Sequence, residues 1–257
     1  DINGDSWPDL LIAGHFMPVT TLLNQEGKFE QQDQLALTRG LWNTVEQADL
    51  DGDGDADFVL GNLGQNNFFQ DGLTVFINDF DQNGSVEQIC CQAGPDGHYP
   101  IHEMPVLKKK YRTYGEFSQA PLEILVPEEL LQSALQLELE EGRSMILCND
   151  AGTLRPVPLP RKAQYSSVNA ILIDDLNADG TPDLILGGND YNYKPQFGRQ
   201  DATFGWRCYG DNQSGDIIFA DCQPIGIEGQ IRSLTKINSN QIIVGIKDGA
   251  VKLYEQD

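Results

Sequence analysis

Basic residues are scarce in this chain of 257 residues, which has 17 lysines and arginines against 39 aspartates and glutamates. The formal net charge of −22 repels the phosphates of nucleic acids and of anionic membranes, so we expect neither as a partner. The acids are concentrated in four short stretches. This pattern indicates cation sites rather than a generally acidic surface.

Long apolar runs are missing as well. No stretch reaches the roughly 18 apolar residues that a membrane helix requires, so we expect no direct membrane insertion. The chain begins at Asp1, inside one of the acidic stretches, and no signal peptide precedes it. We therefore expect a fragment of a longer protein, with the preceding strand and any targeting signal upstream.

Motifs for catalysis are also absent. The sequence contains no Gly-x-Ser-x-Gly, no phosphate-binding glycine loop and no His-Glu-x-x-His. His98 and His102 are four residues apart, but Pro100 between them argues against one helical face and so against a transition-metal site. We predict no catalytic residues and a protein that is not an enzyme.

Cysteine is infrequent, with five residues and no pair at zinc-binding spacing. Cys208 and Cys222 flank an expected hairpin, which leaves a disulfide between them open. We favour the alternative that all five cysteines are buried as small hydrophobic residues.

A nine-residue pattern occurs four times, and we call its copies loops 1 to 4. Each copy has a side-chain oxygen at positions one, three, five and nine, and the last three copies have glycine at position six, where loop 1 has Ser6. The residues that carry these oxygens are Asp1, Asn3, Asp5 and Asp9; Asp49, Asp51, Asp53 and Asp57; Asp79, Asp81, Asn83 and Glu87; and Asp175, Asn177, Asp179 and Asp183.

This spacing suits calcium, which takes six to eight oxygen ligands in irregular geometry. Alternate side chains at positions one, three and five can surround the ion, glycine permits the sharp turn, and position nine completes the shell. The alternative is a set of Asp/Asn/Gly turns without metal. Four copies in the same frame favour calcium, with up to four ions bound.

The loops differ from EF-hands, which need glutamate at position twelve and flanking helices. Position twelve here is Ile12, Leu60, Cys90 or Leu186, and short apolar runs follow the loops. Strand-like segments precede three of them. We therefore predict strand–loop–strand units in which the calcium loop is the hairpin turn.

At these residues the chain resembles the FG-GAP/VCBS repeat family, which occurs in integrin α-subunit propellers and in large bacterial proteins that often carry an ASPIC/UnbV domain. The segments Trp42–Val45, Gly61–Asn66 and Gly187–Asn189 add to the resemblance. The resemblance implies an all-β fold, a β-propeller with blades of four antiparallel strands, and the calcium ligands given above. It covers most of the chain except about 103–160.

We predict that residues 1–257 form one propeller domain or its C-terminal part, with four to five of the seven blades typical of the family. Residues 103–140, where Pro127 precedes two acids and apolar residues at helical spacing, predict a small helical insertion between blades. Loops 2 and 3 are too close for one loop per blade, so we expect both in one blade. Three strands without a metal loop are expected over 231–254.

The residues Asn66, Asn67, Asn189, Tyr191 and Tyr193 are the best candidates for a ligand-binding face, because Tyr and Asn combine flat area with hydrogen bonds. The alternative is that they pack between blades and cap turns. We expect an extracellular or outer-membrane surface module that binds a protein or a glycan. Two alternatives remain open: a carbohydrate-active lyase or hydrolase on a propeller scaffold, and a structural spacer of a larger surface protein.

Overall fold

The computed structural model describes residues 1–257 except 33–34, 70–71, 102–110, 214–215, 239 and 256–257. Its contacts divide the chain into two units. The host unit comprises Asp1–Phe68 and Glu141–Asp257, and the inserted unit comprises Phe69–Glu140. None of the helices in the described part of the chain is long and apolar enough to cross a membrane.

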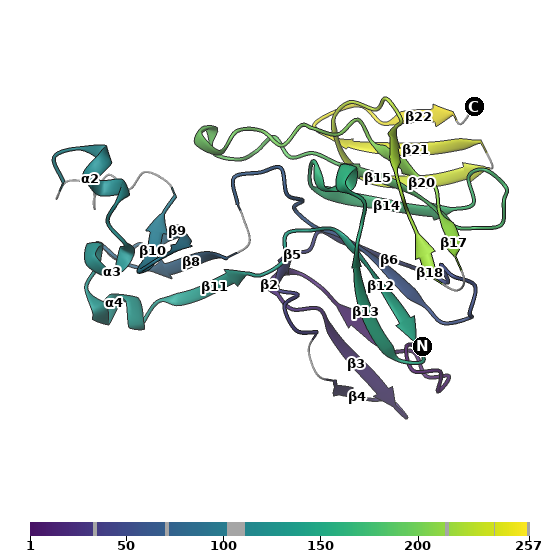
Figure 1. The fold of residues 1–257 in the computed structure, drawn as a ribbon, viewed down its shortest axis with the longest axis horizontal. Coiled ribbons are helices and arrows are strands. Elements are labelled where there is room, and N and C mark those ends of the chain that lie inside the picture. Colours follow the sequence, from purple (N-terminus) through teal and green to yellow (C-terminus); the bar gives the residue numbers. More distant parts are fainter. Residues whose placement is uncertain (33–34, 70–71, 102–110, 214–215, 239, 256–257) are drawn as a thin grey trace. The chain divides into compact units, whose positions relative to one another are not determined.

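The host unit contains four antiparallel sheets of three or four strands within its described residues (Figure 1). We number them I to IV in chain order. Sheet I has the order β1-β3-β4 and sheet II the order β6-β7-β12-β13, followed by sheet III with β14-β15-β16-β19 and sheet IV with β20-β21-β22. Their bounds are β1 Leu10–Ile12, β3 Thr20–Gln25, β4 Lys28–Gln31, β6 Thr44–Ala48, β7 Asp57–Gly61, β12 Met145–Asp150, β13 Thr153–Pro158, β14 Val168–Asp174, β15 Asp183–Gly188, β16 Trp206–Cys208, β19 Cys222–Pro224, β20 Gln230–Asn238, β21 Gln241–Lys247 and β22 Lys252–Glu255.

Two short pairs of strands and two 3-10 turns complete the host unit as described. The pairs are β2-β5 and β17-β18. Their bounds are β2 His15–Met17, β5 Gly40–Leu41, β17 Asp211–Gln213 and β18 Asp216–Ile218, and the turns are η1 Arg161–Gln164 and η2 Pro195–Phe197.

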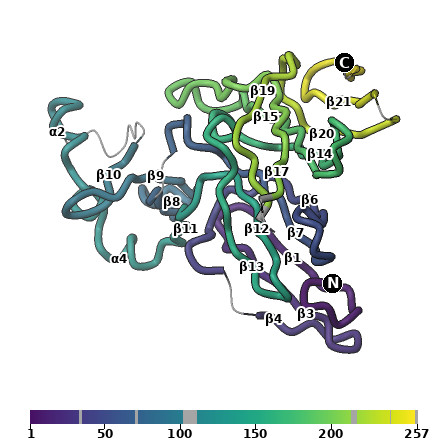
Figure 2. Tube along the Cα trace, turned by 45° about the vertical axis from the view of Figure 1, so that its right-hand side comes forward, coloured from purple at the N-terminus to yellow at the C-terminus, as the bar shows by residue number. Residues whose placement is uncertain are grey.

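The sheets of the host unit pack face to face in chain order. One apolar cluster joins sheets I and II, a second joins II and III, and a third joins III and IV. In β7, Phe58 and Leu60 contribute to the first cluster and Val59, between them, to the second. A central strand buried on both faces reads as a continuous apolar run, as the sequence shows here. Figure 2 shows β14 close to both β6 and β20, in agreement with the contacts between these strands.

The inserted unit has its own four-stranded sheet of order β10-β9-β8-β11 and three short helices within its described residues. The helices cover an apolar cluster that includes Phe76, Ile89 and Leu122. The bounds are β8 Leu73–Asn78, β9 Glu87–Gly94, β10 Gly97–Pro100, β11 Leu135–Leu139, α2 Tyr114–Ser118, α3 Leu122–Leu125 and α4 Glu128–Gln132.

The structure confirms the all-β class with antiparallel, blade-like sheets. The strands expected over 231–254 are present as β20, β21 and β22, and the expected helix after Pro127 is α4. The insertion expected over 103–140 and between blades is part of a larger unit that starts at Phe69. In the sequence this unit is inserted between β7 and β12, which are neighbouring strands of sheet II. Of this segment, residues 102–110 lie outside the described part.

The favoured view of the cysteines was wrong. Cys208 and Cys222 form a disulfide, and Cys90, Cys91 and Cys148 are not disulfide-bonded. The two half-cystines lie directly opposite each other on β16 and β19. The sequence pointed to one hairpin between them, but the intervening residues form the β17-β18 pair, so the bridge joins neighbouring strands of sheet III.

Candidate metal-binding loops

Each Asp-rich loop adjoins the strand predicted for it. Loop 1 (residues 1–9) runs into β1. Loop 2 (49–57) connects β6 to β7, loop 3 (79–87) connects β8 to β9, and loop 4 (175–183) connects β14 to β15. The strand–loop–strand units are therefore confirmed for loops 2, 3 and 4. The expectation that loops 2 and 3 share a blade was wrong, because loop 2 belongs to sheet II and loop 3 to the sheet of the inserted unit.

The carboxylate at position one organises the turn in every loop. In loop 2, Asp49 accepts hydrogen bonds from the backbone N–H groups of Gly52 (2.8 Å) and Gly54 (3.1 Å). In loops 1, 3 and 4 the position-one carboxylate likewise accepts from position six and from position four or five. Because each carboxylate oxygen has more than one lone-pair site, these bonds leave room for a cation.

Positions three and five follow a second shared rule. The side-chain oxygen at position three accepts the N–H of position five, and the oxygen at position five accepts the N–H of position seven. These are the local turns that Asp and Asn form with backbone two residues ahead. These hydrogen bonds lie entirely within each loop, so the loop's own residues orient the side-chain oxygens at positions three and five.

Position nine ties the loop to the sheet. Asp57 accepts the N–H of Leu50, at position two of its own loop, at 2.9 Å, and the N–H of Asn149 on β12 at 2.8 Å. In loops 1 and 4, Asp9 and Asp183 repeat both bonds, with Asn24 on β3 and with Gly210 just after β16. Each of these partners is on or next to the neighbouring strand of the same sheet. The ninth carboxylate is thus structural as well as a candidate ligand.

Positions two and four also shape the loops and were not among the predicted site residues. Position two is apolar in every loop, and in loops 1, 2 and 3 its side chain is buried: Ile2, Leu50 and Phe80. Position four has a left-handed backbone, as position six does, and is occupied by Gly4, Gly52, Gln82 and Ala178. The sequence did carry an indication of both features: position two is apolar in every loop, and position four is glycine in loops 1 and 2.

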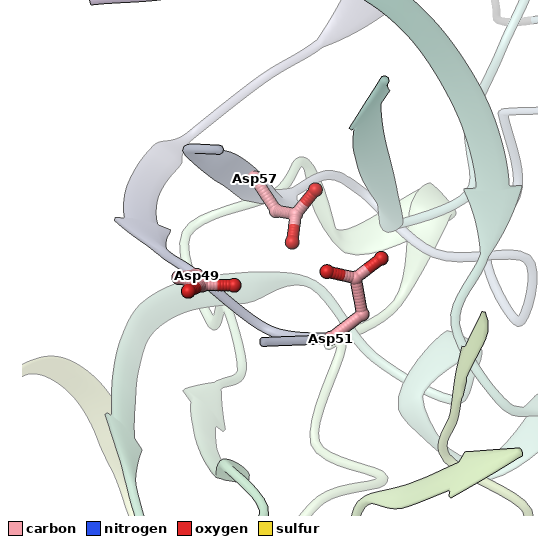
Figure 3. Close-up of side chains that lie close together, drawn as sticks. All are labelled: Asp49, Asp51 and Asp57. Carbon is pink, nitrogen blue, oxygen red and sulfur yellow. The ribbon is translucent and has the colours of Figure 1, made fainter. Parts of the chain in front are cut away.

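The carboxylates of loops 2 and 3 converge closely enough for one ion. Oxygens of Asp49, Asp51 and Asp57 all lie within 4.8 Å of one another, and Figure 3 shows the three side chains directed into a common space. The oxygens of Asp79, Asp81 and Glu87 do the same in loop 3. This spacing fits oxygens that share a calcium ion, each at about 2.3–2.6 Å from it.

Loops 1 and 4 have asparagine at position three and so present fewer carboxylates. In both, the asparagine side-chain amide donates to the position-five carboxylate, from Asn3 to Asp5 and from Asn177 to Asp179. In loop 2, Asp53 is the expected fourth ligand and lies outside the close group of three.

Burial and neighbouring charges raise the pKa of three loop carboxylates. Burial, together with the charges of Asp53 and Asp49, raises the pKa of Asp51. Burial raises the pKa of Asp57, and burial with the charges of Asp179 and Asp175 raises that of Asp183. A bound divalent cation would compensate the mutual repulsion that contributes to these shifts. In the exposed part of loop 4, hydrogen bonds from Thr181 and Asn177 lower the pKa of Asp179.

The candidate ligand-face residues occupy different environments. Asn189 is buried, and its amide bonds to Ser166, Thr203 and Gly229. This favours the alternative in which it holds turns together. The side-chain amides of Asn66 and Asn67 donate to the carbonyls of Tyr165 and Gly64. Tyr191 and Tyr193 are half-buried, and burial beside Asp190 raises the pKa of Tyr193 to about 12.

The histidines do not come together in the described structure. His98 on β10 pairs with Glu123 on α3, at 2.7 Å between Nδ1 and Oε1. His102 lies outside the described residues.

Successive antiparallel sheets, each packed on the next, with an acidic loop leading into the second strand of sheets II and III, define a repeat protein of the propeller-blade type. Residues 1–60 match the family model described as an FG-GAP-like repeat, which confirms the resemblance and assigns this segment to that family. The matched segment covers sheet I and the first hairpin of sheet II, with loops 1 and 2. A search of curated proteins found no match to the chain.

Proposed function

We propose that this chain is a calcium-binding recognition module that works outside the cytoplasm. The observation that carries the proposal is the common geometry of the four loops. In each loop the side chains at positions one, three and five accept backbone N–H groups further along the loop, and the carboxylate at position nine accepts the N–H of position two. Loops that bind calcium weakly, with dissociation constants of about 10⁻⁴–10⁻³ M, are filled at extracellular but not at cytosolic calcium concentrations.

Two further observations support the extracellular setting. FG-GAP repeats are typical of extracellular proteins, and residues 1–60 match that family. The Cys208–Cys222 disulfide is the kind of crosslink that persists in oxidising compartments. We propose recognition because calcium bound in the loops would have a structural role and would leave the remaining surface of the sheets available for a ligand.

Thermal unfolding in excess calcium and in excess chelator tests the metal. At 10 mM calcium, a site of this class adds about 1.4–2.7 kcal/mol to the free energy of unfolding. Three loops lie in the host unit, so we expect about 4–8 kcal/mol there and a midpoint raised by many degrees. Magnesium at the same concentration is the control for ionic strength and for non-specific cation binding.

A variant set locates the effect. Asp51→Asn with Asp53→Asn removes two carboxylates of loop 2 but keeps the oxygens that accept backbone N–H groups. It should lose the calcium increment of one loop. Glu30→Gln with Glu46→Gln removes the same charge from exposed strand positions and should keep the full calcium shift. Equal midpoints with calcium and with chelator would refute the proposal.

A further inference from the structure

A surface pocket of about 400 Å³ lies in the host unit, away from the Asp-rich loops. Its walls come from three connections: the segment after β15, the segment before β20 and the β21–β22 turn. Pockets of this volume are of the size that holds small ligands. One of the candidate ligand-face residues, Tyr191, lines it.

The Tyr191 wall is held in place from several directions. The backbone N–H of Tyr191 donates to Oε1 of Gln230, a buried side chain, at 3.0 Å. The guanidinium carbon of Arg199 lies 3.9 Å from the centre of the Tyr191 ring. Just before it, Asn189 is anchored by its buried amide. A ring fixed in this way offers flat apolar area at little further cost in conformational entropy.

Two glycines, Gly229 and Gly249, line the pocket together with Ile246. A Cβ atom at Gly229 would lie 2.7 Å from Cγ2 of Ile246, and one at Gly249 would lie 2.9 Å from the same atom. Glycine at these two positions therefore lets the backbone lie directly on Ile246.

Four of the residues that line the pocket are charged, two of each sign: Glu228, Asp248, Lys247 and Lys252. The side chains of Glu228, Asp248 and Lys247 have no hydrogen-bond or ion-pair partner within the described residues. Lys252 donates to the backbone carbonyl of Glu228 at 3.2 Å. Both acceptors and donors are therefore available to a ligand at a locally neutral rim.

We propose that this pocket binds a neutral saccharide. A sugar has an apolar C–H face that packs on an aromatic ring, and its hydroxyl groups both donate and accept hydrogen bonds. Tyr191 supplies the ring, the carboxylates accept from hydroxyls, and Lys247 donates to them. An anionic ligand would require an excess of cations, which the balanced rim does not offer.

This inference deepens the proposed recognition function by naming the ligand class and its site. It does not depend on the calcium proposal, because no residue of loops 1 to 4 lines the pocket. A calcium shift in the melting experiment without sugar binding would refute the pocket alone. Sugar binding that depends on the pocket, without a calcium shift, would refute the metal alone.

The test uses the full chain, in excess calcium, on an array of immobilised neutral and uronate-containing oligosaccharides. The best-bound neutral oligosaccharide is then titrated calorimetrically against Tyr191→Ala and Lys247→Ala. We expect each variant to weaken binding by about tenfold or more, since each removes a principal contact. Phe29→Ala and Lys28→Ala, which change the same kinds of side chain at exposed positions of β4, are the matched controls and should bind like the wild type.

Thermal unfolding of each variant verifies that it is folded. If Tyr191→Ala unfolds, Lys247→Ala at the exposed rim still decides the matter. The proposal is overturned if the wild type binds no neutral oligosaccharide on the array, if it binds only the acidic ones, or if Lys247→Ala and folded Tyr191→Ala retain wild-type affinity.

Discussion

Replacing Asp57 by alanine separates the structural role of the ninth loop position from its role as a metal ligand. Only 1% of Asp57 is exposed, and its two oxygens accept the N–H groups of Leu50 and Asn149. Leu50 is fully buried, so neither water nor another group replaces the lost acceptor without rearrangement. Each unsatisfied buried donor costs about 1–3 kcal/mol.

The expected loss of unfolding free energy is about 2–4 kcal/mol, measured by denaturant in excess chelator. The figure is below the full sum for two donors because burial raises the pKa of Asp57, and removing the carboxylate recovers part of that unfavourable term. The comparison is Asp51→Ala. Within the described residues, the Asp51 side chain accepts the loop N–H of Asp53, at 3.1 Å, so this replacement should change the apo stability by about 0.5 kcal/mol or less.

In excess calcium, both variants should lack the gain in unfolding free energy that calcium binding to loop 2 gives the wild type. The reasoning is refuted if Asp57→Ala and Asp51→Ala have the same stability in chelator. It is also refuted if Asp57→Ala is as stable as the wild type there.

Three further predictions concern other parts of the chain. Ser6 has a left-handed backbone (φ 73°), so Ser6→Gly should raise the stability of the host unit by about 1 kcal/mol in denaturant, and a loss would contradict the strain argument. Reducing the Cys208–Cys222 disulfide, whose partners are 14 residues apart, should cost about 3 kcal/mol. Thiol titration of the unfolded, unreduced protein should find three reactive thiols, and five would show that the bridge is absent. For Glu123, burial acts to raise the pKa, but hydrogen bonds from His98 outweigh it and lower the pKa, so its stabilising effect is present at neutral pH and is lost as the pH falls through the lowered value. The stability difference between the wild type and Glu123→Gln should therefore disappear on acidification, and a gap that persists in acid would exclude this linkage.

The geometry of the Asp-rich loops could be predicted from the sequence because their hydrogen bonds are local. Asp and Asn at alternate positions bond to backbone two residues ahead, so the spacing alone implies the turn. The strands beside the loops were readable for a similar reason, since β7 and β15 are apolar runs bounded by turn residues. The partners of the ninth position were not readable. Asn149 is far from Asp57 in sequence and meets it only when β12 pairs with β7.

The insertion and the disulfide depended on the same kind of non-local information. The sequence shows a short helical pattern after Pro127, but not that strands from 73 to 139 pair among themselves in a separate sheet. Two cysteines can be opposite each other only when the register of β16 and β19 is known. The hydrophobic periodicity of a strand or a helix does not specify which strands pair or in which register. The inserted sheet and the disulfide both depend on that pairing.

The place of the inserted unit has a consequence for synthesis on the ribosome. Strand β7 ends at Gly61, but its neighbour β12 begins only at Met145. While the ribosome makes the residues between them, the β6–β7 hairpin must wait with one edge unpaired. In the described part of the chain, strands β8 to β11 pair with one another and with no other strand, so they can fold as soon as they emerge. Translation therefore orders the folding of sheet II: the inserted unit can form first, and β12 pairs with β7 afterwards.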